Sequence, residues 1–328
     1  MIAMKDLSDK KILVTGGAGF MGSHLVDKLI ANDLHVKVLD NLSSGTKLNL
    51  KNCLNKKNFQ FFNKDLNNSS SIKDILSDVN LIFHLAANPE VRTGFNNPEI
   101  SFRENIENTF HLLEAIRKSN IETIVFTSSS TIYGEAEIIP TPENYGPLYP
   151  ISHYGASKLA CEALISSYCH SYGINGLIFR LANIVGSRNS HGVIIDFIKK
   201  LQCDNKTLQI LGDGTQSKSY LHVSDCIDAF LFCLSKIEKK MRIFNLGNYD
   251  QTDVITIAQK VIEKLSINNV KILTSNDVPD GRGWIGDVKF MNLDIKKLED
   301  LGWKPKLSSS SAVDMAIAEN IEEIGAKK

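Results

Sequence analysis

The chain has 328 residues, 43% of them hydrophobic, and its 37 lysine and arginine residues balance 37 aspartate and glutamate residues. A chain of this size can bury a full core, and zero net charge excludes a global field that would draw it to nucleic acid or to an anionic membrane. Six cysteines without a C-x-x-C pattern or metal-like spacing favour free thiols in a reducing compartment and no bound metal. Residues 1–8 lack the apolar core of a secretory leader, and no apolar run suits a membrane span, so we expect a cytoplasmic protein.

Strand-like and helix-like segments alternate through the first half of the chain. The expected strands are Lys11–Thr15, His35–Asp40, Phe59–Phe62, Asn80–Leu85, Thr123–Ser128 and Gly176–Leu181. The expected helices are 19–32, 71–76, 99–119 and 152–172. This alternation with short connections predicts a Rossmann-type α/β fold, a doubly wound parallel sheet covered on both faces.

The pattern loosens after residue 186 into shorter elements. Strands are expected at 208–211, 243–246 and 270–273, and helices at 193–202, 224–235, 256–265 and 308–324. We therefore predict a cofactor-binding domain over residues 1–186 and a smaller α/β substrate-binding domain over residues 187–328.

Three glycines follow the first strand and open the first helix, with the spacing Gly16-x-x-Gly19-x-x-Gly22. A helix N-terminus offers unpaired amide donors and the positive end of a dipole, which together favour a pyrophosphate. Glycine lets that pyrophosphate approach the backbone. The pattern indicates a dinucleotide site, although a simple tight turn would use the same residues.

The second strand ends in Asp40, about twenty residues after the glycines. A carboxylate at that place can accept both adenosine ribose hydroxyls and would repel a 2′-phosphate. The following residues 41–45 contain no arginine to hold such a phosphate. NAD is therefore favoured over NADP, the alternative being that Asp40 only begins a loop.

A candidate catalytic set lies in the middle of the chain. Tyr154 and Lys158 are four residues apart in a helical run, so their side chains share one face. A lysine ammonium and an oxidised nicotinamide ring would both favour the phenolate, making tyrosine a usable base near neutral pH. The strand at 123–128 ends in Ser128-Ser129-Ser130, whose hydroxyls can relay a hydrogen bond to substrate or can simply cap a turn. A Tyr-x-x-x-Lys pair also occurs on ordinary surface helices.

Several motifs in order resemble the extended short-chain dehydrogenase/reductases. They are residues 15–22, 40–45, 84–87, 128–130, 154–158, 180–186, 211–216, 220–225 and 244–247. Within that group the chain is similar to the nucleotide-sugar epimerases and dehydratases, especially the UDP-glucose 4-epimerases. The resemblance covers nearly the whole chain.

The resemblance implies roles for individual residues. Ser129, Tyr154 and Lys158 would be catalytic. The cofactor would contact Gly16, Gly19, Phe20, Met21, Gly22, Asp40, Asn41, Ser44, Gly45, Asp65, Leu66, Leu85, Ala86, Ala87, Asn105, Ser128, Tyr154 and Lys158. The nucleotide sugar would contact Ser129, Ser130, Asn183, Val193, Ile194, Lys218 and Arg282. A purely structural role is the alternative for Asn105, and Lys218 replaces an arginine usual in the family, which loses bidentate geometry toward phosphate.

Two kinds of reaction found among the relatives require residues that this chain lacks. Dehydratase relatives have an Asp-Glu pair after the catalytic hydroxyl, where this chain has Ser130-Thr131. Decarboxylase relatives have an arginine after the lysine, where this chain has Leu159. The resemblance therefore implies C4 epimerisation of UDP-glucose and UDP-galactose: Tyr154 takes the O4 proton, a resident NAD accepts the C4 hydride, and the 4-keto sugar receives it back on the opposite face.

Several alternatives stay open. Met291 falls on or near the family's sugar-pocket gate, where a flexible methionine is compatible with a hexose or a larger N-acetylhexosamine. A uronate as the sugar, and dTDP in place of UDP, stay open as well. A dehydratase, a reductase or a non-catalytic sensor of NAD or nucleotide sugar is also conceivable on this scaffold. Relatives form homodimers through two helices matching 99–119 and 152–172, where Ile106, Phe110 and Leu113 would face either a partner or the core.

Overall fold

The computed structural model describes residues 7–67, 69–236, 241–275 and 277–325. Most of residues 1–8, where we expected no secretory leader, lies outside the described residues. The chain forms two compact units. The first comprises residues 1–129, 153–180 and 227–244, and the second comprises residues 130–152, 181–226 and 245–328. The boundary expected after residue 186 lies inside the second unit, and the assignment of cofactor and substrate to separate domains stays a prediction. Within the described ranges, no helix is long and apolar enough to cross a membrane.

The first unit is built on a seven-stranded sheet with the order β3-β2-β1-β4-β5-β6-β11. Its strands are β1 (Lys11–Thr15), β2 (His35–Asp40), β3 (Phe59–Asn63), β4 (Leu81–His84), β5 (Thr123–Ser129), β6 (Asn175–Leu181) and β11 (Arg242–Leu246). Strand β1 pairs in parallel with β2 and β4, β2 with β3, and β4 with β5. The chain order reverses between β1 and β4, the place where open α/β sheets bind ligands. The predicted Rossmann-type fold is confirmed.

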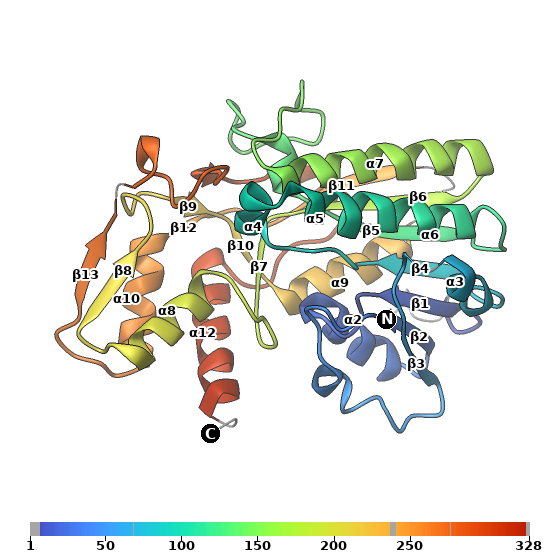
Figure 1. Ribbon diagram of the computed structural model, residues 1–328, viewed down its shortest axis with the longest axis horizontal. Helices are drawn as coiled ribbons and strands as arrows, with labels where there is room; N and C mark the ends of the chain where they lie inside the picture. The colour runs from blue at the N-terminus through green and yellow to red at the C-terminus, as the bar shows by residue number, and fades with distance from the viewer. Residues whose placement is uncertain (1–6, 68, 237–240, 276, 326–328) are drawn as a thin grey trace. The chain divides into compact units, whose positions relative to one another are not determined.

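Helices cover both faces of this sheet (Figure 1). The helices that belong wholly or mostly to the first unit are α2 (Phe20–Ile30), η1 (Lys47–Leu50), α3 (Ser69–Ile75), α4 (Val91–Asn96), α5 (Pro98–Ser101), η2 (Phe102–Glu107), α6 (Asn108–Ile116), α7 (His153–Tyr172) and α9 (Val223–Leu234). Side chains along β6 alternate between the two faces of the sheet. Ile178 joins the core under α3, α6 and α7, whereas the Phe179 ring packs against Phe230 of α9, with ring centroids 4.7 Å apart. Helices α2 and α9 lie on the second face.

The helix expected over residues 99–119 is interrupted by a π-helical segment, η2. Two side chains just beyond it donate to helix carbonyls four residues earlier. The Asn108 amide nitrogen donates to the Glu104 carbonyl at 3.1 Å, and the Thr109 hydroxyl to the Asn105 carbonyl at 2.6 Å. Such side-chain donors compete for helix carbonyls and are known to distort the ladder.

Strand β11 and most of α9, expected in the smaller part of the chain, belong to the first unit. The reason is aromatic packing against β6. Phe179 lies between Phe230 of α9 and Phe244 of β11, with ring centroids 4.7 Å and 6.0 Å away. All three rings are fully or almost fully buried, and buried aromatic side chains add strongly to core stability.

The second unit combines three small sheets with a helical core. Its elements are η3 (Ser130–Tyr133), β7 (Asn183–Val185), α8 (Val193–Cys203), β8 (Thr207–Ile210), β9 (Ser217–Lys218), β10 (Tyr220–His222), β12 (Thr252–Asp253), α10 (Val254–Lys264), β13 (Lys271–Thr274), η4 (Pro279–Gly281), β14 (Phe290–Met291), α11 (Lys296–Asp300) and α12 (Ser309–Gly325). The sheets are β10-β7, β12-β9-β14 and β13-β8. Apolar residues of α8, α10 and α12, including Ile198, Ile257 and Val313, form one buried core.

Candidate active site

The glycine turn between β1 and α2 has no room for side chains. A β-carbon on Gly16 would lie 2.7 Å from the Ala86 amide nitrogen, and one on Gly22 would lie 2.1 Å from the Gly16 carbonyl oxygen. Gly16 also has a left-handed φ of 69°. Helix α2 begins after Gly19, which has no side chain to cap the first amides of the helix. The turn is therefore a backbone cradle at a helix N-terminus, which suits a diphosphate.

Asp40 lies beside this cradle at the end of β2. Its Oδ2 accepts a hydrogen bond from the Ala18 amide at 2.9 Å, and its Oδ1 accepts one from the Leu42 amide at 2.8 Å. Burial raises the pKa of the Asp40 carboxyl, and these two hydrogen bonds partly offset that rise. Each carboxylate oxygen keeps a second lone pair, so the group can still accept ribose hydroxyls.

The other residues expected to contact the cofactor follow the ends of neighbouring strands. The Asn41 amide donates to Asp65 at 2.8 Å, and a β-carbon on Gly45 would lie 2.8 Å from the Ala18 carbonyl oxygen. The Ala86 amide donates to the Thr15 hydroxyl at 3.3 Å. The remaining members of this set are Phe20 and Met21 at the start of α2, the exposed Ser44, the buried Leu66, and Leu85 and Ala87 beside Ala86. The first unit thus places these residues at the carboxyl edge of one sheet.

The expected catalytic side chains meet at the end of β5. The Tyr154 hydroxyl and Ser129 form a side-chain hydrogen bond. The Lys158 ammonium donates to the Thr127 carbonyl at 2.9 Å and lies 5.8 Å from the centroid of the Tyr154 ring. Lys158 is only 3% exposed. The four-residue spacing on α7 therefore delivers both side chains to the strand end that carries Ser129.

Burial governs the electrostatics of this set. It raises the pKa of Tyr154 to about 12, although the hydrogen bond with Ser129 acts in the opposite direction. It also lowers the pKa of Lys158 to about 8. The low tyrosine pKa expected from a neighbouring lysine is thus not produced by the side chains of this chain alone. A lysine with a pKa this close to neutrality is a common feature of functional sites.

A hydrogen-bonded chain that the sequence did not predict links the glycine turn to α7. Thr15 bonds to Nδ1 of His84 at 2.8 Å, and Nε2 of His84 bonds to the Thr109 hydroxyl at 3.0 Å. Burial is the main cause that lowers the pKa of His84 to about 3, so the ring is neutral. Because Thr109 donates to the Asn105 carbonyl, it accepts from Nε2, and Nδ1 accepts from Thr15. The sequence placed His84 at the end of a strand and in the motif at residues 84–87, but it gave no sign of these hydrogen bonds.

Asn105 continues this chain toward the catalytic helix. Its Oδ1 accepts from the Asn88 amide at 2.8 Å, and its Nδ2 donates to the Ser157 hydroxyl at 2.8 Å. Ser157 in turn donates to the Tyr154 carbonyl at 2.8 Å. Both ends of the Asn105 amide therefore bind protein groups, which is the structural role held as the alternative. Direct contact with a cofactor stays a prediction.

In the second unit, Asp287 gathers two of the cations expected to bind phosphate. The Lys218 ammonium contacts Asp287 Oδ1 at 2.6 Å, and Arg282 donates to the Asp287 carbonyl at 2.8 Å. Arg282 also pairs with Glu135. Asp287 is 3% exposed and was not predicted to belong to the site. Because Asp287 binds both Lys218 and Arg282, it holds the two cations near each other.

Asn183 belongs to the same cluster. Its side chain hydrogen-bonds the Tyr220 hydroxyl, whose pKa is raised by burial first and by Asp287 second. Met291 pairs with Lys218 in the parallel register of β14 and β9. The side chain of Ile194, by contrast, is buried in the helical core with Val193 packed against it, so Ile194 can reach a ligand only through its backbone. Ser130 is buried at the start of η3.

The first unit fits a dinucleotide by two further observations. The buried Ser128 hydroxyl has no hydrogen-bond partner within the described part of the chain, and buried polar atoms of this kind are usually satisfied. The turn at Gly16 and Gly22 requires glycine, because a β-carbon at either position would overlap backbone atoms. The residues present therefore suit NAD.

The fold and the site define a NAD-dependent short-chain dehydrogenase/reductase of the extended type. Residues 12–247 match the model of the NAD dependent epimerase/dehydratase family. The chain belongs to this family, and its cofactor is NAD.

Three similar proteins illustrate the range of the family. A putative UDP-glucose 4-epimerase of Methanocaldococcus jannaschii is 37% identical over 93% of this chain and 97% of its own length. A crystal structure of a UDP-galactose 4-epimerase is 40% identical with a TM-score of 0.85, covering 96% of this chain and 99% of the other. A UDP-glucuronic acid 4-epimerase of Bacillus cereus, solved with a fluorinated UDP-glucuronic acid and NAD, is 29% identical with a TM-score of 0.85 and covers 96% and 99%.

Proposed function

We propose that the protein is a UDP-glucose 4-epimerase that interconverts UDP-glucose and UDP-galactose through a transient 4-keto sugar. The observation that carries the proposal is the hydrogen bond between Ser129 and Tyr154 with buried Lys158 beside it. The turn that follows, Ser130–Tyr133, contains no carboxylate to eliminate water from the sugar.

The residues divide the chemistry as follows. NAD, when bound, supplies a reversible acceptor for the hydride on C4. Tyr154 removes the proton from O4, with Ser129 holding the same oxygen, and returns it to the ketone oxygen after the sugar has turned. We expect the positive charge of the Lys158 ammonium to stabilise the Tyr154 phenolate that takes up this proton.

We propose that the nucleotide, and not the sugar, carries the binding energy. Asn183, Lys218 and Arg282 would hold the diphosphate, with Asp287 fixing the two cations in position. A loosely held sugar can present either face, which inversion at C4 requires. Met291 lies beside Lys218, and its flexible side chain does not by itself select one sugar. Assays must therefore distinguish a hexose, an N-acetylhexosamine and a uronate.

The test is conversion of UDP-galactose to UDP-glucose, followed by NMR, alongside a panel of UDP- and dTDP-linked hexoses, N-acetylhexosamines and uronates. Tyr154→Phe should lower kcat by about 10²-fold or more, the usual contribution of a general base. Tyr172→Phe is the matched control, because Tyr172 is an exposed tyrosine on the same helix. Near-normal turnover in the Tyr154 variant would refute the mechanism.

We also propose a cytoplasmic homodimer. Among the described residues, none of the six cysteines forms a disulfide, which is what a reducing compartment would maintain. Phe102 and Phe110 are exposed on η2 and α6, which supports pairing through this helical segment. Leu113, by contrast, is fully buried in the core. Light scattering should give twice the chain mass of 36.4 kDa.

A further inference from the structure

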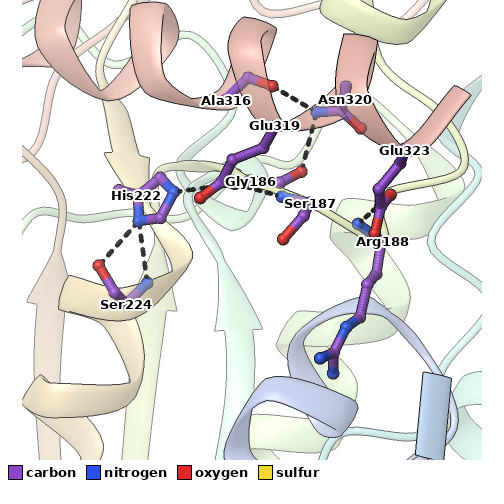
Figure 2. Close-up of polar contacts among 9 residues, drawn as sticks. All are labelled: Gly186, Ser187, Arg188, His222, Ser224, Ala316, Glu319, Asn320 and Glu323. Carbon is purple, nitrogen blue, oxygen red and sulfur yellow. Dashed lines mark hydrogen bonds and ion pairs between the residues drawn. The ribbon is translucent and has the colours of Figure 1, made fainter. Parts of the chain in front are cut away.

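Helix α12 holds the turn that follows β7 by carboxylates on one of its faces (Figure 2). Glu319 Oε2 accepts a hydrogen bond from the Ser187 amide at 2.7 Å, and Glu323 Oε2 accepts one from the Arg188 amide at 2.9 Å. The two glutamates are four residues apart, so they lie one above the other along the helix. Hydrogen bonds between a carboxylate and an amide are among the stronger ones in proteins.

The backbone of this turn adopts conformations that need such support. Arg188 has a left-handed φ of 63°, which non-glycine residues rarely adopt. A β-carbon on Gly186 would lie 2.6 Å from Val223 Cγ1. The buried Asn320 donates to the Gly186 carbonyl at 3.0 Å, from the same face of α12. Three consecutive residues of the turn are thus held by one helix.

His222 fixes the orientation of Glu319. Nδ1 of His222 accepts from the Ser224 amide at 3.3 Å, and an amide can only donate. In the neutral ring Nε2 therefore carries the proton, which it donates to Glu319 Oε2 at 3.3 Å. The same carboxylate oxygen thus receives donors from β10 and from the turn.

The held turn is joined to the residues proposed to bind nucleotide. Asn183 begins β7, which pairs with β10 so that Asn183 lies beside Tyr220 and Val185 beside His222. Ser309, the first residue of α12, accepts from the Tyr220 amide at 3.1 Å. Helix α12 therefore contacts both ends of this strand pair, and residues 189–192 connect the turn to α8, which begins at Val193.

We propose that α12 positions the nucleotide-binding residues. Glu319 and Glu323 act through the turn at residues 186–188 on Asn183 and on the start of α8, and so set the affinity for UDP without touching it. This inference rests on the proposed function, because it takes Asn183 as a ligand of the diphosphate. Glu319 and Glu323 are positioning residues and not catalytic ones.

The experiment measures the Kd for UDP by calorimetry, the NAD content of each preparation, and KM and kcat for the UDP-sugar. Glu319→Ala should weaken UDP binding about tenfold, or about 1.4 kcal/mol, and raise KM with kcat within twofold. Glu319→Gln keeps an oxygen that accepts from both donors and should restore the affinity to within about threefold. Glu322→Ala is the matched control, an exposed glutamate on the same turn of α12, and should change nothing.

NAD content separates positioning from general destabilisation, because the proposed NAD residues lie in the first unit. An unchanged NAD content with weaker UDP binding supports the inference, and parallel loss of both ligands overturns it. If the alanine variant does not fold, Glu323→Ala, at a half-buried residue, should weaken UDP binding about threefold. Wild-type UDP affinity in the variants overturns this inference alone, whereas a wild-type protein that does not bind UDP overturns the proposed function as well.

Discussion

Replacing Gly22 by alanine should impair NAD binding at the glycine turn without unfolding the rest of the protein. The new β-carbon would lie 2.1 Å from the Gly16 carbonyl oxygen and 2.7 Å from the Gly17 α-carbon. Both neighbours are backbone atoms, so the turn itself must move by about 1.3 Å to bring the shorter contact to the 3.4 Å at which ordinary contact begins. Overpacking of this kind typically costs about 1–3 kcal/mol, and a misplacement of about 1 Å can cost about 10²-fold in rate.

The assay is the NAD content of the purified variant, measured after denaturation, together with kcat for UDP-galactose. We expect NAD content well below one per chain and kcat lower by about 10²-fold. Gly94→Ala is the control, because a β-carbon there would meet Ser101 and His153 at ordinary distances of 3.4 Å and 3.5 Å. A Gly22 variant with full NAD content and a rate within threefold of wild type would refute the cradle.

Two further predictions concern buried charge. The Lys158 ammonium should be lost as the pH rises through about 8, so kcat should decline above that pH, and a flat profile to pH 9.5 would contradict its role. The pKa of Lys158 in the folded protein lies below its ordinary value of 10.5, so burying the charged lysine costs stability below pH 8. That cost is relieved between pH 8 and 10.5, because the folded state loses the proton there while the unfolded state keeps it. Urea unfolding should therefore show wild type gaining stability relative to Lys158→Met across that pH range. Glu162→Ala leaves Arg180, only 5% exposed, without the carboxylate 2.8 Å away and should cost about 3–5 kcal/mol in denaturant unfolding. Glu99→Ala, which removes an exposed pair with Arg103, should have no measurable effect, and equal losses in both variants would disprove the difference attributed to burial.

The sequence predicted the parts of the fold that depend on local pattern. The strand, glycine turn and helix around Gly16 and Gly22, the acid at the end of β2 and the pair on α7 all follow from short-range spacing. The π-helical segment was not predictable, because it depends on Asn108 and Thr109 donating to particular carbonyls. The placement of β11 was not predictable either, since its apolar residues suit any sheet edge and only the packing of Phe244 on Phe179 decides.

The candidate site shows the same division. Ser129, Tyr154 and Lys158 are close in space because two elements bring them there, and their motif predicted it. The contacts of Asp287 with Lys218, and of His84 with Thr15 and Thr109, were not predicted from the sequence. Contacts between residues far apart in the sequence leave no local pattern to read.

The interleaving of the two units has a consequence for biosynthesis. The ribosome delivers residues 1–180 before α9 and β11, yet Phe179 finds its partners Phe230 and Phe244 only in those later elements. Domains generally fold as units, the N-terminal one first, while the chain is still being made. Here Phe179 lacks both ring partners until residue 244 has been synthesised, so the first unit is completed only after residues 181–226 of the second unit have been made.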